Sequence, residues 1–207
     1  MATDSTQQRL LQAAIHIFAS KGYYDATVAD ICEAAGANIA AVNYHFNGKE
    51  NLFRHVLRAA FHQANAVYPI EGTLPPDAPA EDKLRAFMDA LIRRGLDPGG
   101  AGDFNRIMVH HGTREAAPED LVFTEVSGLQ GNTLTTILTE LLGTSAKDRI
   151  AQARLNVIGL CIFPNIAHLL RRQLLPDHPS PARVRRFIDG QFAFALAGLV
   201  KLSPVSA

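Results

Sequence analysis

Neutral hydrogen-bonding side chains crowd the end of one short segment, "ANIAAVNYHFNGKE" (37–50). Asn43, Tyr44 and His45 come just before a turn, and Lys49 follows it. Amide, hydroxyl and imidazole groups donate hydrogen bonds that phosphate oxygens accept. A lysine among the free amides at the start of a helix also suits a phosphate. These residue types indicate contact with a phosphate backbone.

The first part of the same segment carries very small side chains. At about 100° per residue, one face of a helix here is apolar and is expected to pack inward: Ile39, Val42 and Phe46. Ala40 and Ala41 lie opposite with Tyr44, and Asn43 and His45 flank them. Small residues let a helix sit deep in a DNA major groove, where alanine methyls can meet thymine methyls. The segment therefore predicts a recognition helix.

The rest of the chain shows no constellation typical of an enzyme. It contains no nucleophile elbow, P-loop or dinucleotide fingerprint. His110 and His111 are adjacent, so on a helix they point apart and rarely share a metal. Cys32 and Cys161 sit far apart in apolar helical patterns, which favours two buried free thiols over a disulfide or metal site. We expect no catalytic residues, no metal and no cofactor.

Composition indicates a soluble cytoplasmic protein with a substantial core. Of the 207 residues, 47% are hydrophobic, yet no apolar run reaches the length of a membrane span. The N-terminus lacks the layout of a signal peptide. Twenty basic residues balance 20 acidic ones, and residues 1–60 hold five of each. Because nucleic-acid sites are usually basic, charge argues against DNA binding unless neutral donors and helix N-termini supply most contacts.

The hydrophobic pattern predicts an all-α fold of about nine helices. The first four are expected at about 6–21, 27–35, 39–46 and 49–68, with a glycine-containing turn between the second and third. Three short helices with such a turn suit a helix-turn-helix. "TVAD" predicts a capping box in which Thr27 starts the second helix. Thr27 would offer a phosphate contact there, as Lys49 does at the start of the fourth.

A proline-rich stretch, 68–82, separates this part from the rest and contains four prolines. We expect a helix-turn-helix domain at 1–50, a connecting helix at 49–68, and a larger ligand-binding and dimerisation domain at 69–207. Its five helices are predicted from their apolar stripes and boundary residues: around 84–92, around 104–111, 118–142, from a capping-box-like start at 145–148 to about 175, and from 180 to about 199.

Polar residues within the apolar stripes of that second part are candidates for a ligand pocket, because a buried polar group needs a partner. The predicted pocket residues are Phe87, His111, Phe123, Gln130 and Asn165. Each polar one could instead be a core residue satisfied by a neighbour, or a dimer contact. Pro164 should kink the helix beside Asn165. The last two expected helices carry more apolar surface than one face needs, which favours a homodimer interface.

Residues 10–57 resemble the N-terminal domain of the TetR family of bacterial transcriptional regulators. The motifs that carry the resemblance are "AA…F…KGY", "T.ADI…AG" and "YHF..KE.L". The variant "ANIAAVNYHF" followed by "KENL" is similar to the branch typified by CecR (YbiH). The resemblance implies an N-terminal three-helix helix-turn-helix domain and a larger C-terminal helical domain that binds a ligand and forms the dimer.

The resemblance also implies roles for individual residues. Thr27, Tyr44, His45 and Lys49 would lie on the phosphate side, and three others would face or border the bases: Ala40, Ala41 and Asn43. Many members carry glycine and then threonine or serine in place of the two alanines, and tyrosine in place of the asparagine. A tyrosine–phosphate contact that is common in the family would then be absent or replaced by an amide contact.

The expected function is that of a homodimeric repressor. It would bind double-stranded operator DNA and be released by a small apolar or amphipathic effector. No membrane partner is expected. The alternative is an all-helical small-molecule-binding protein without DNA function, which the zero net charge of residues 1–60 supports.

Overall fold

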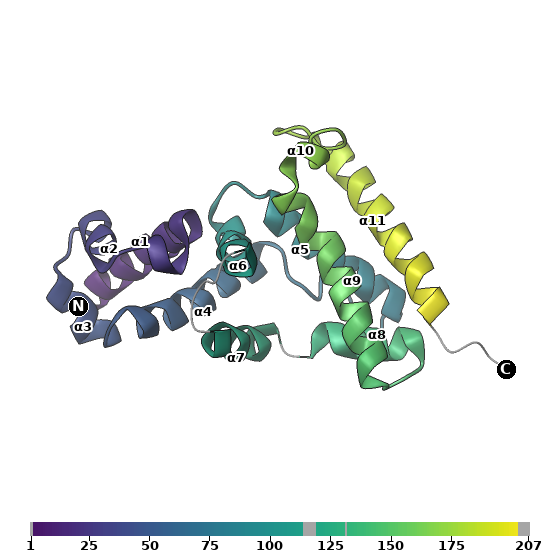
Figure 1. The fold of residues 1–207 in the computed structure, drawn as a ribbon, viewed down its shortest axis with the longest axis horizontal. Helices are drawn as coiled ribbons and strands as arrows, with labels where there is room; N and C mark the ends of the chain where they lie inside the picture. The colour runs from purple at the N-terminus through teal and green to yellow at the C-terminus, as the bar shows by residue number, and fades with distance from the viewer. Residues whose placement is uncertain (1, 114–118, 131, 203–207) are drawn as a thin grey trace. The chain divides into compact units, whose positions relative to one another are not determined.

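The computed structural model describes residues 2–113, 119–130 and 132–202, and these residues form helices and connecting segments without a strand. This confirms the predicted all-α fold (Figure 1). The elements in chain order are α1 (Ala2–Asp25), α2 (Val28–Ala35), α3 (Ile39–Phe46), α4 (Lys49–Val67), α5 (Ala80–Leu96), the short 3-10 helix η1 (Gly100–Gly102), α6 (Asp103–Thr113), α7 (Glu119–Gln130), α8 (Thr133–Leu142), α9 (Lys147–Ile166), α10 (His168–Arg171) and α11 (Pro181–Leu202).

The chain separates into two compact units. The first consists of Met1–Val67 and Asp97–Gly131, and the second of Tyr68–Leu96 and Asn132–Ala207. The predicted domains, 1–50 and 69–207, are functional divisions and stay predictions. Within the described residues, no helix is long and apolar enough to span a membrane.

An aromatic cluster holds the first unit together. The Phe18 ring of α1 meets the Phe53 ring of α4 edge-on, with 4.9 Å between ring centroids. Tyr23 completes the cluster at 4.9 Å from the Phe53 ring. Edge-to-face aromatic pairs add stability beyond the area they bury. The cluster fixes α1 against α4, and α2 and α3 pack onto this pair.

Gly22 changes the path of α1 before the helix ends. Its φ of 78° and ψ of 178° lie in a region that glycine alone adopts readily. A Cβ there would also come within 3.4 Å of the His110 side chain of α6. The predicted stop at Gly22 is therefore a sharp turn of the backbone, after which helical hydrogen bonding resumes as far as Asp25.

We expect Gly22→Ala to lower the free energy of unfolding by about 1–3 kcal/mol, because alanine is strained at these dihedral angles. Chemical denaturation followed by circular dichroism measures the change. Ser20→Ala, at an exposed position of the same helix, is the matched control and should change stability little. Equal stability of the Gly22 variant and the wild type would contradict the strained conformation.

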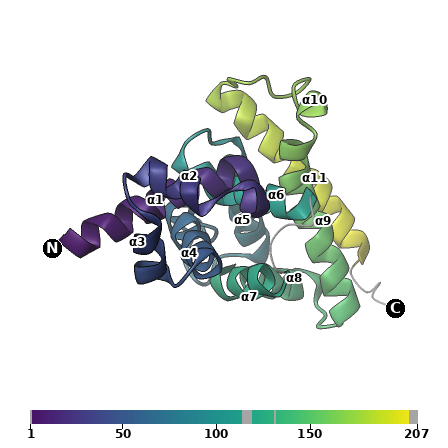
Figure 2. The same cartoon turned by 60° about the vertical axis from the view of Figure 1, so that its left-hand side comes forward.

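The second unit is built around α5, which contacts α8, α9 and α11. Arg94, near the end of α5, is buried and donates from Nε and Nη2 to the carbonyl of Tyr68, at 3.0 and 2.6 Å. Burial lowers the pKa of Arg94 to about 10, so the side chain is still charged at neutral pH. The α9 and α11 helices lie side by side and run in opposite directions (Figures 1 and 2).

Three boundary predictions are wrong. The predicted helix at 118–142 is two helices, α7 and α8, and the sequence between them is Gly131-Asn132, a pair that favours helix ends. The capping box predicted at 145–148 is absent, because Ala146 caps α9 and has no side-chain cap bond. That helix ends at Ile166 and not near Leu175, two residues after Pro164 removes a backbone donor.

Two thiols lie in the interior. Cys32 in the first unit and Cys161 in the second are both buried and free. Burial raises the pKa of the Cys161 thiol to about 12 and also raises that of Cys32. The two cysteines are thus buried free thiols, as predicted.

Candidate nucleic-acid interface

The start of α2 has the predicted capping box. The Thr27 hydroxyl accepts a hydrogen bond from the Asp30 amide at 3.0 Å, and the Asp30 carboxylate accepts one from the Thr27 amide at 3.1 Å. Lys21 also donates to Asp30, at 2.9 Å, and this bond is the main reason that the pKa of Asp30 is lowered. The cap uses a lone pair of the Thr27 hydroxyl, so its proton stays available to donate outward.

A three-residue turn joins α2 to α3. Gly36 caps α2 in the left-handed conformation, with φ of 59°, and its amide donates to carbonyls of the last turn. Asn38 then caps α3, where its side-chain oxygen accepts from the Ala41 amide at 2.9 Å. Asn38 was not predicted as a cap, although an asparagine just before an apolar-periodic segment is a known helix start. The geometry is that of a helix-turn-helix.

The outward face of α3 is a stripe of three exposed residues at helical spacing, and the exposed Asn47 follows the helix as its C-cap. Ala40, Asn43, Tyr44 and Asn47 are exposed, and the Tyr44 side chain is open to solvent at 78%. Two of the other predicted residues are half-buried: Ala41 and His45. The Tyr44 and His45 rings meet edge-on at 4.9 Å. Asn43 thus lies on the open face rather than beside it.

Ile39 departs from the prediction that it packs inward. It is 55% exposed, whereas Val42 and Phe46 are buried as expected. Side chains on a helix tilt toward its N-terminus, so the first residue of α3 projects beyond the neighbours that cover the next turn. The result is an aliphatic group beside Ala40 on the helix that would enter the groove.

Lys49 begins α4 directly after Gly48. Its ammonium lies 4.5 Å from the centroid of the Tyr23 ring, an arrangement that attracts a cation to the face of the ring. The side chain is half-buried, and burial lowers its pKa. All seven predicted DNA-binding residues therefore lie in the first unit, at the start of α2, along α3 and at the start of α4.

Most cations of residues 1–60 are bound within the protein. Lys21 pairs with Asp30 at 2.9 Å. On α4, Arg54 pairs with Glu50 at 3.0 Å, and Arg58 pairs with Glu125 at 2.7 Å. These carboxylates reduce the positive charge that the first unit presents to a phosphate backbone. Fewer cations of residues 1–60 are therefore available to a phosphate than the sequence alone indicates.

Glu125 of α7 joins the two arginines of α4. Its side chain is only 9% exposed and accepts from Arg58 Nε at 2.7 Å, Arg58 Nη2 at 2.9 Å and Arg54 Nη1 at 3.4 Å. Its bonds with Arg58, above all, hold the pKa of the Glu125 carboxyl below its ordinary value. This clamp fixes α4 to α7. Nothing in the sequence pattern paired residues so far apart.

We expect Glu125→Gln to lower the free energy of unfolding by about 1–3 kcal/mol, since it removes charge-assisted hydrogen bonds from a buried acceptor. The carboxyl's pKa is lowered in the folded state, so the clamp is fully stabilising above the ordinary glutamate pKa. Its contribution is lost as the pH falls through the folded-state value. Denaturation midpoints across acidic pH should therefore fall less steeply in the variant.

Glu50→Gln is the control for this clamp. Glu50 makes an exposed pair with Arg54 on the same helix, and such pairs contribute about 0–1 kcal/mol. Two outcomes would contradict a stabilising role for the Glu125 clamp. Either both variants lose the same free energy of unfolding, or the denaturation midpoint of the Glu125 variant falls with pH as steeply as that of the wild type.

The predicted ligand residues are distributed over both units. Phe87 and Asn165 belong to the second unit, and His111 belongs to the first. The side chains of Phe123 and Gln130 lie outside the described ones. Phe87 is buried in the core, while His111 is half-buried on α6. The grouping of these five residues into one pocket stays a prediction.

Asn165 has an unusual environment within the second unit. Its amide nitrogen is buried without a hydrogen-bond partner in the described part of the chain. A Cβ added to Gly95 would overlap that nitrogen, so the amide fills the space that a side chain on α5 would need. Asn165 therefore couples the end of α9 to the end of α5.

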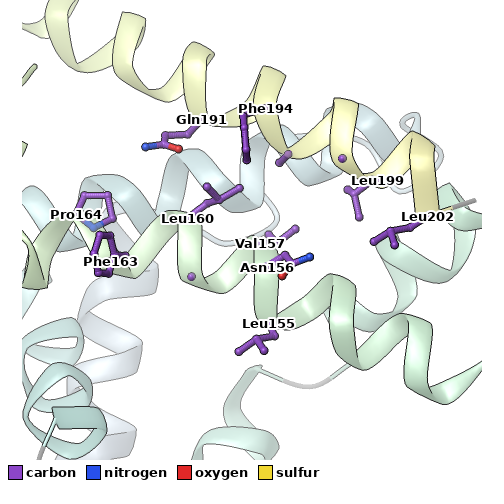
Figure 3. Close-up of a pocket in the computed structure, with 13 residues that line it drawn as sticks. Leu155, Asn156, Val157, Leu160, Phe163, Pro164, Gln191, Phe194, Leu199 and Leu202 are labelled. Carbon is purple, nitrogen blue, oxygen red and sulfur yellow. The ribbon is translucent and has the colours of Figure 1, made fainter.

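A groove of about 700 Å³ runs between α9 and α11, and most of the residues that line it are apolar. Figure 3 shows Phe194 and Leu199 pointing from α11 toward α9, with Leu160 and Val157 on the facing side. Phe163 is 58% exposed and Phe194 is 71% exposed. Large exposed apolar side chains gathered along two helices mark a surface suited to another protein.

Comparison with known proteins identifies the helix-turn-helix region. The model of the bacterial regulatory proteins of the tetR family matches residues 10–56. An uncharacterized HTH-type transcriptional regulator of Pseudomonas putida, TtgW, is 32% identical over 111 residues, which cover 54% of this chain and 78% of TtgW. The likeness to TtgW is therefore longer than the helix-turn-helix region alone.

Two further proteins are similar to this chain, one in sequence over part of its length and one in fold over nearly all of its length. The HTH-type transcriptional regulator SrpR of Pseudomonas putida is 31% identical over 113 residues, 55% of this chain, and the match spans only half of the length of SrpR. The crystal structure of the transcriptional regulator FadR from Bacillus subtilis, in complex with stearoyl-CoA, superposes with a TM-score of 0.65 at 16% identity. That superposition covers 92% of this chain and 98% of FadR and shows the likeness of fold.

Proposed function

Because this chain belongs to the TetR family of bacterial transcriptional regulators, we propose that it is a repressor whose two α3 helices, in a homodimer, read an operator in double-stranded DNA. The observation that carries the proposal is the exposed stripe of Ala40, Asn43 and Tyr44 on a capped helix in a helix-turn-helix. Two such helices would enter successive major grooves about 34–36 Å apart.

The exposure of each side chain supports a division of roles on DNA. Asn43 is the candidate base reader, since an asparagine amide can pair with an adenine edge in the major groove. Ala40 and Ala41 would border the bases and leave room for close approach. Thr27, Tyr44 and Lys49 would contact phosphates, and His45, half-buried beside Tyr44, would do so at the flank.

Fluorescence anisotropy with DNA from upstream of the protein's own gene tests this proposal. We expect Asn43→Ala to weaken binding to the operator by about tenfold, the scale of one lost base contact. Asn132→Ala, at an exposed asparagine of the second unit, is the matched control and should leave affinity unchanged. Tyr44→Phe, which removes one hydroxyl, should weaken operator and random DNA alike, because phosphates carry no sequence information.

The salt dependence of operator binding tests whether few lysines and arginines contact phosphates, as expected when most cations of residues 1–60 are paired with carboxylates. The slope of log affinity against log salt follows the number of phosphates neutralised by lysines and arginines. We expect a shallow slope, well below that for about six phosphates per subunit. No sequence-specific binding to any neighbouring promoter at moderate salt would instead favour the alternative, a small-molecule-binding protein without DNA function.

The proposed dimer uses the groove between α9 and α11. Its apolar lining and its exposed phenylalanines support an interface in which the same surface of a second copy packs against it. We expect Phe163→Asp to weaken the dimer by at least about tenfold, because a charge would be buried in the contact. Analytical ultracentrifugation measures this. Leu170→Asp, at an exposed leucine of α10 outside the groove, should leave the dimer intact.

The proposed effector is a small apolar or amphipathic molecule bound in the C-terminal helical domain. Bacillus subtilis FadR, which has the same fold, was crystallised with stearoyl-CoA, and the unpartnered amide of Asn165 would suit an acceptor on a ligand. Release requires that the effector bind the two conformations of the dimer unequally. The pocket residues and the likeness to the CecR branch remain predictions.

A further inference from the structure

The chain near the start of α11 carries an excess of positive charge. Residues 171–189 contain five arginines and two aspartates, whereas the whole chain is neutral. Both aspartates are occupied: Asp177 binds Arg172 at 2.8 Å, and Asp189 binds Arg85 of α5. In the ranges that the structure describes, the remaining arginines of α11 have no acidic partner: Arg183, Arg185 and Arg186.

Two of these arginines line a groove of about 460 Å³ within the second unit. Arg183 and Arg186 stand three residues apart on one side of α11, near its start, so the lining of the groove is cationic toward that end of the helix. The same side continues through Phe187 and Gly190 to Phe194, and Gln173, Leu174 and Gln191 complete the lining. The described lining contains no carboxylate.

The apolar part of the groove is open to solvent in the single subunit, and Gln191 and Phe194 line both this groove and the α9–α11 groove proposed for the dimer. The Leu174 side chain is 62% exposed and that of Phe194 is 71% exposed. From Arg186 to Phe194 the helix rises by about 12 Å, at about 1.5 Å per residue. A cationic end and an apolar floor of this length match a single anionic group that carries a medium-length alkyl chain. The five predicted effector residues are all absent from this lining.

We propose that this groove binds an anionic amphiphile at a site separate from the effector pocket. Its carboxylate or phosphate accepts hydrogen bonds from Arg183 and Arg186, and its chain lies along Leu174 and Phe187 as far as Phe194, where the groove meets the one proposed for the dimer. Arginine is suited to this role because its planar donors engage such anions in pairs and keep their charge at all physiological pH values. Gly190 leaves space between the two phenylalanines for the chain to pass.

Isothermal titration calorimetry of the full chain with dodecanoate tests the site. We expect saturable binding that Arg186→Gln weakens by about tenfold, the scale of lost charge-assisted hydrogen bonds. Arg185→Gln removes the same charge from the adjacent position, which does not line the groove, and should leave affinity unchanged. Dodecanol should bind far more weakly than dodecanoate. Titration with dodecyl phosphate shows which of the two anionic groups the arginines prefer.

A diazirine-bearing dodecanoate analogue locates the bound chain. Its label should fall on peptides spanning 171–194 and disappear in the double variant R183Q/R186Q. Equal losses in the Arg185 and Arg186 variants would overturn the proposal, because they would mean non-specific charge attraction. Labelling near Asn165 or Phe87 alone would also overturn it, because it would place the amphiphile in the proposed effector pocket.

Sedimentation of R183Q/R186Q measures dimerisation and so shows whether these two arginines bind the amphiphile or contact the second subunit. The variant should dimerise as the wild type does and lose dodecanoate binding. A weakened dimer with unchanged dodecanoate binding would show that the arginines meet a second copy, which overturns the site. Operator binding plays no part in these readouts, so failure of the proposed DNA function would leave the result interpretable.

Discussion

The burial of Val42 and Phe46 is the constraint on which the candidate interface depends. Helix α3 has eight residues, and a helix that short does not persist in water by itself. Two buried side chains, an asparagine cap at its start and a left-handed Asn47 at its end hold it in place. Because so little of the helix is needed for packing, nearly all of its other face is free for a partner.

The first unit uses much of its charge internally. The carboxylates of Asp30, Glu50 and Glu125 each bind a cation of the same unit, and the pairs made by Asp30 and Glu125 also tie α1 to α2 and α4 to α7. Charge that stabilises the fold is thus unavailable for attraction at long range. A protein built in this way depends more on fit and on neutral donors than on a field of positive charge, which favours discrimination between sequences over general affinity for DNA.

The helix-turn-helix was predictable because local signals determine it. The threonine and aspartate of the capping box, Gly36 and the apolar spacing placed α2, α3 and the start of α4 correctly. Ile39 was misplaced because periodicity alone does not show where the covering neighbours end. The Glu125 clamp and the occupied arginines could not be predicted, because they join residues that only the tertiary fold brings together. The break between α7 and α8 was missed because the apolar stripe continued across Gly131.

The contact between Gly95 and Asn165 makes two distant positions share one volume. The amide occupies the place of the missing Cβ, so residue 95 cannot gain a side chain while Asn165 stays as it is. Over evolutionary time such a pair is expected to change jointly: a larger residue on α5 becomes acceptable only when the asparagine on α9 has become smaller. Paired substitutions at positions 95 and 165 in related chains would then indicate that α5 and α9 are in contact there.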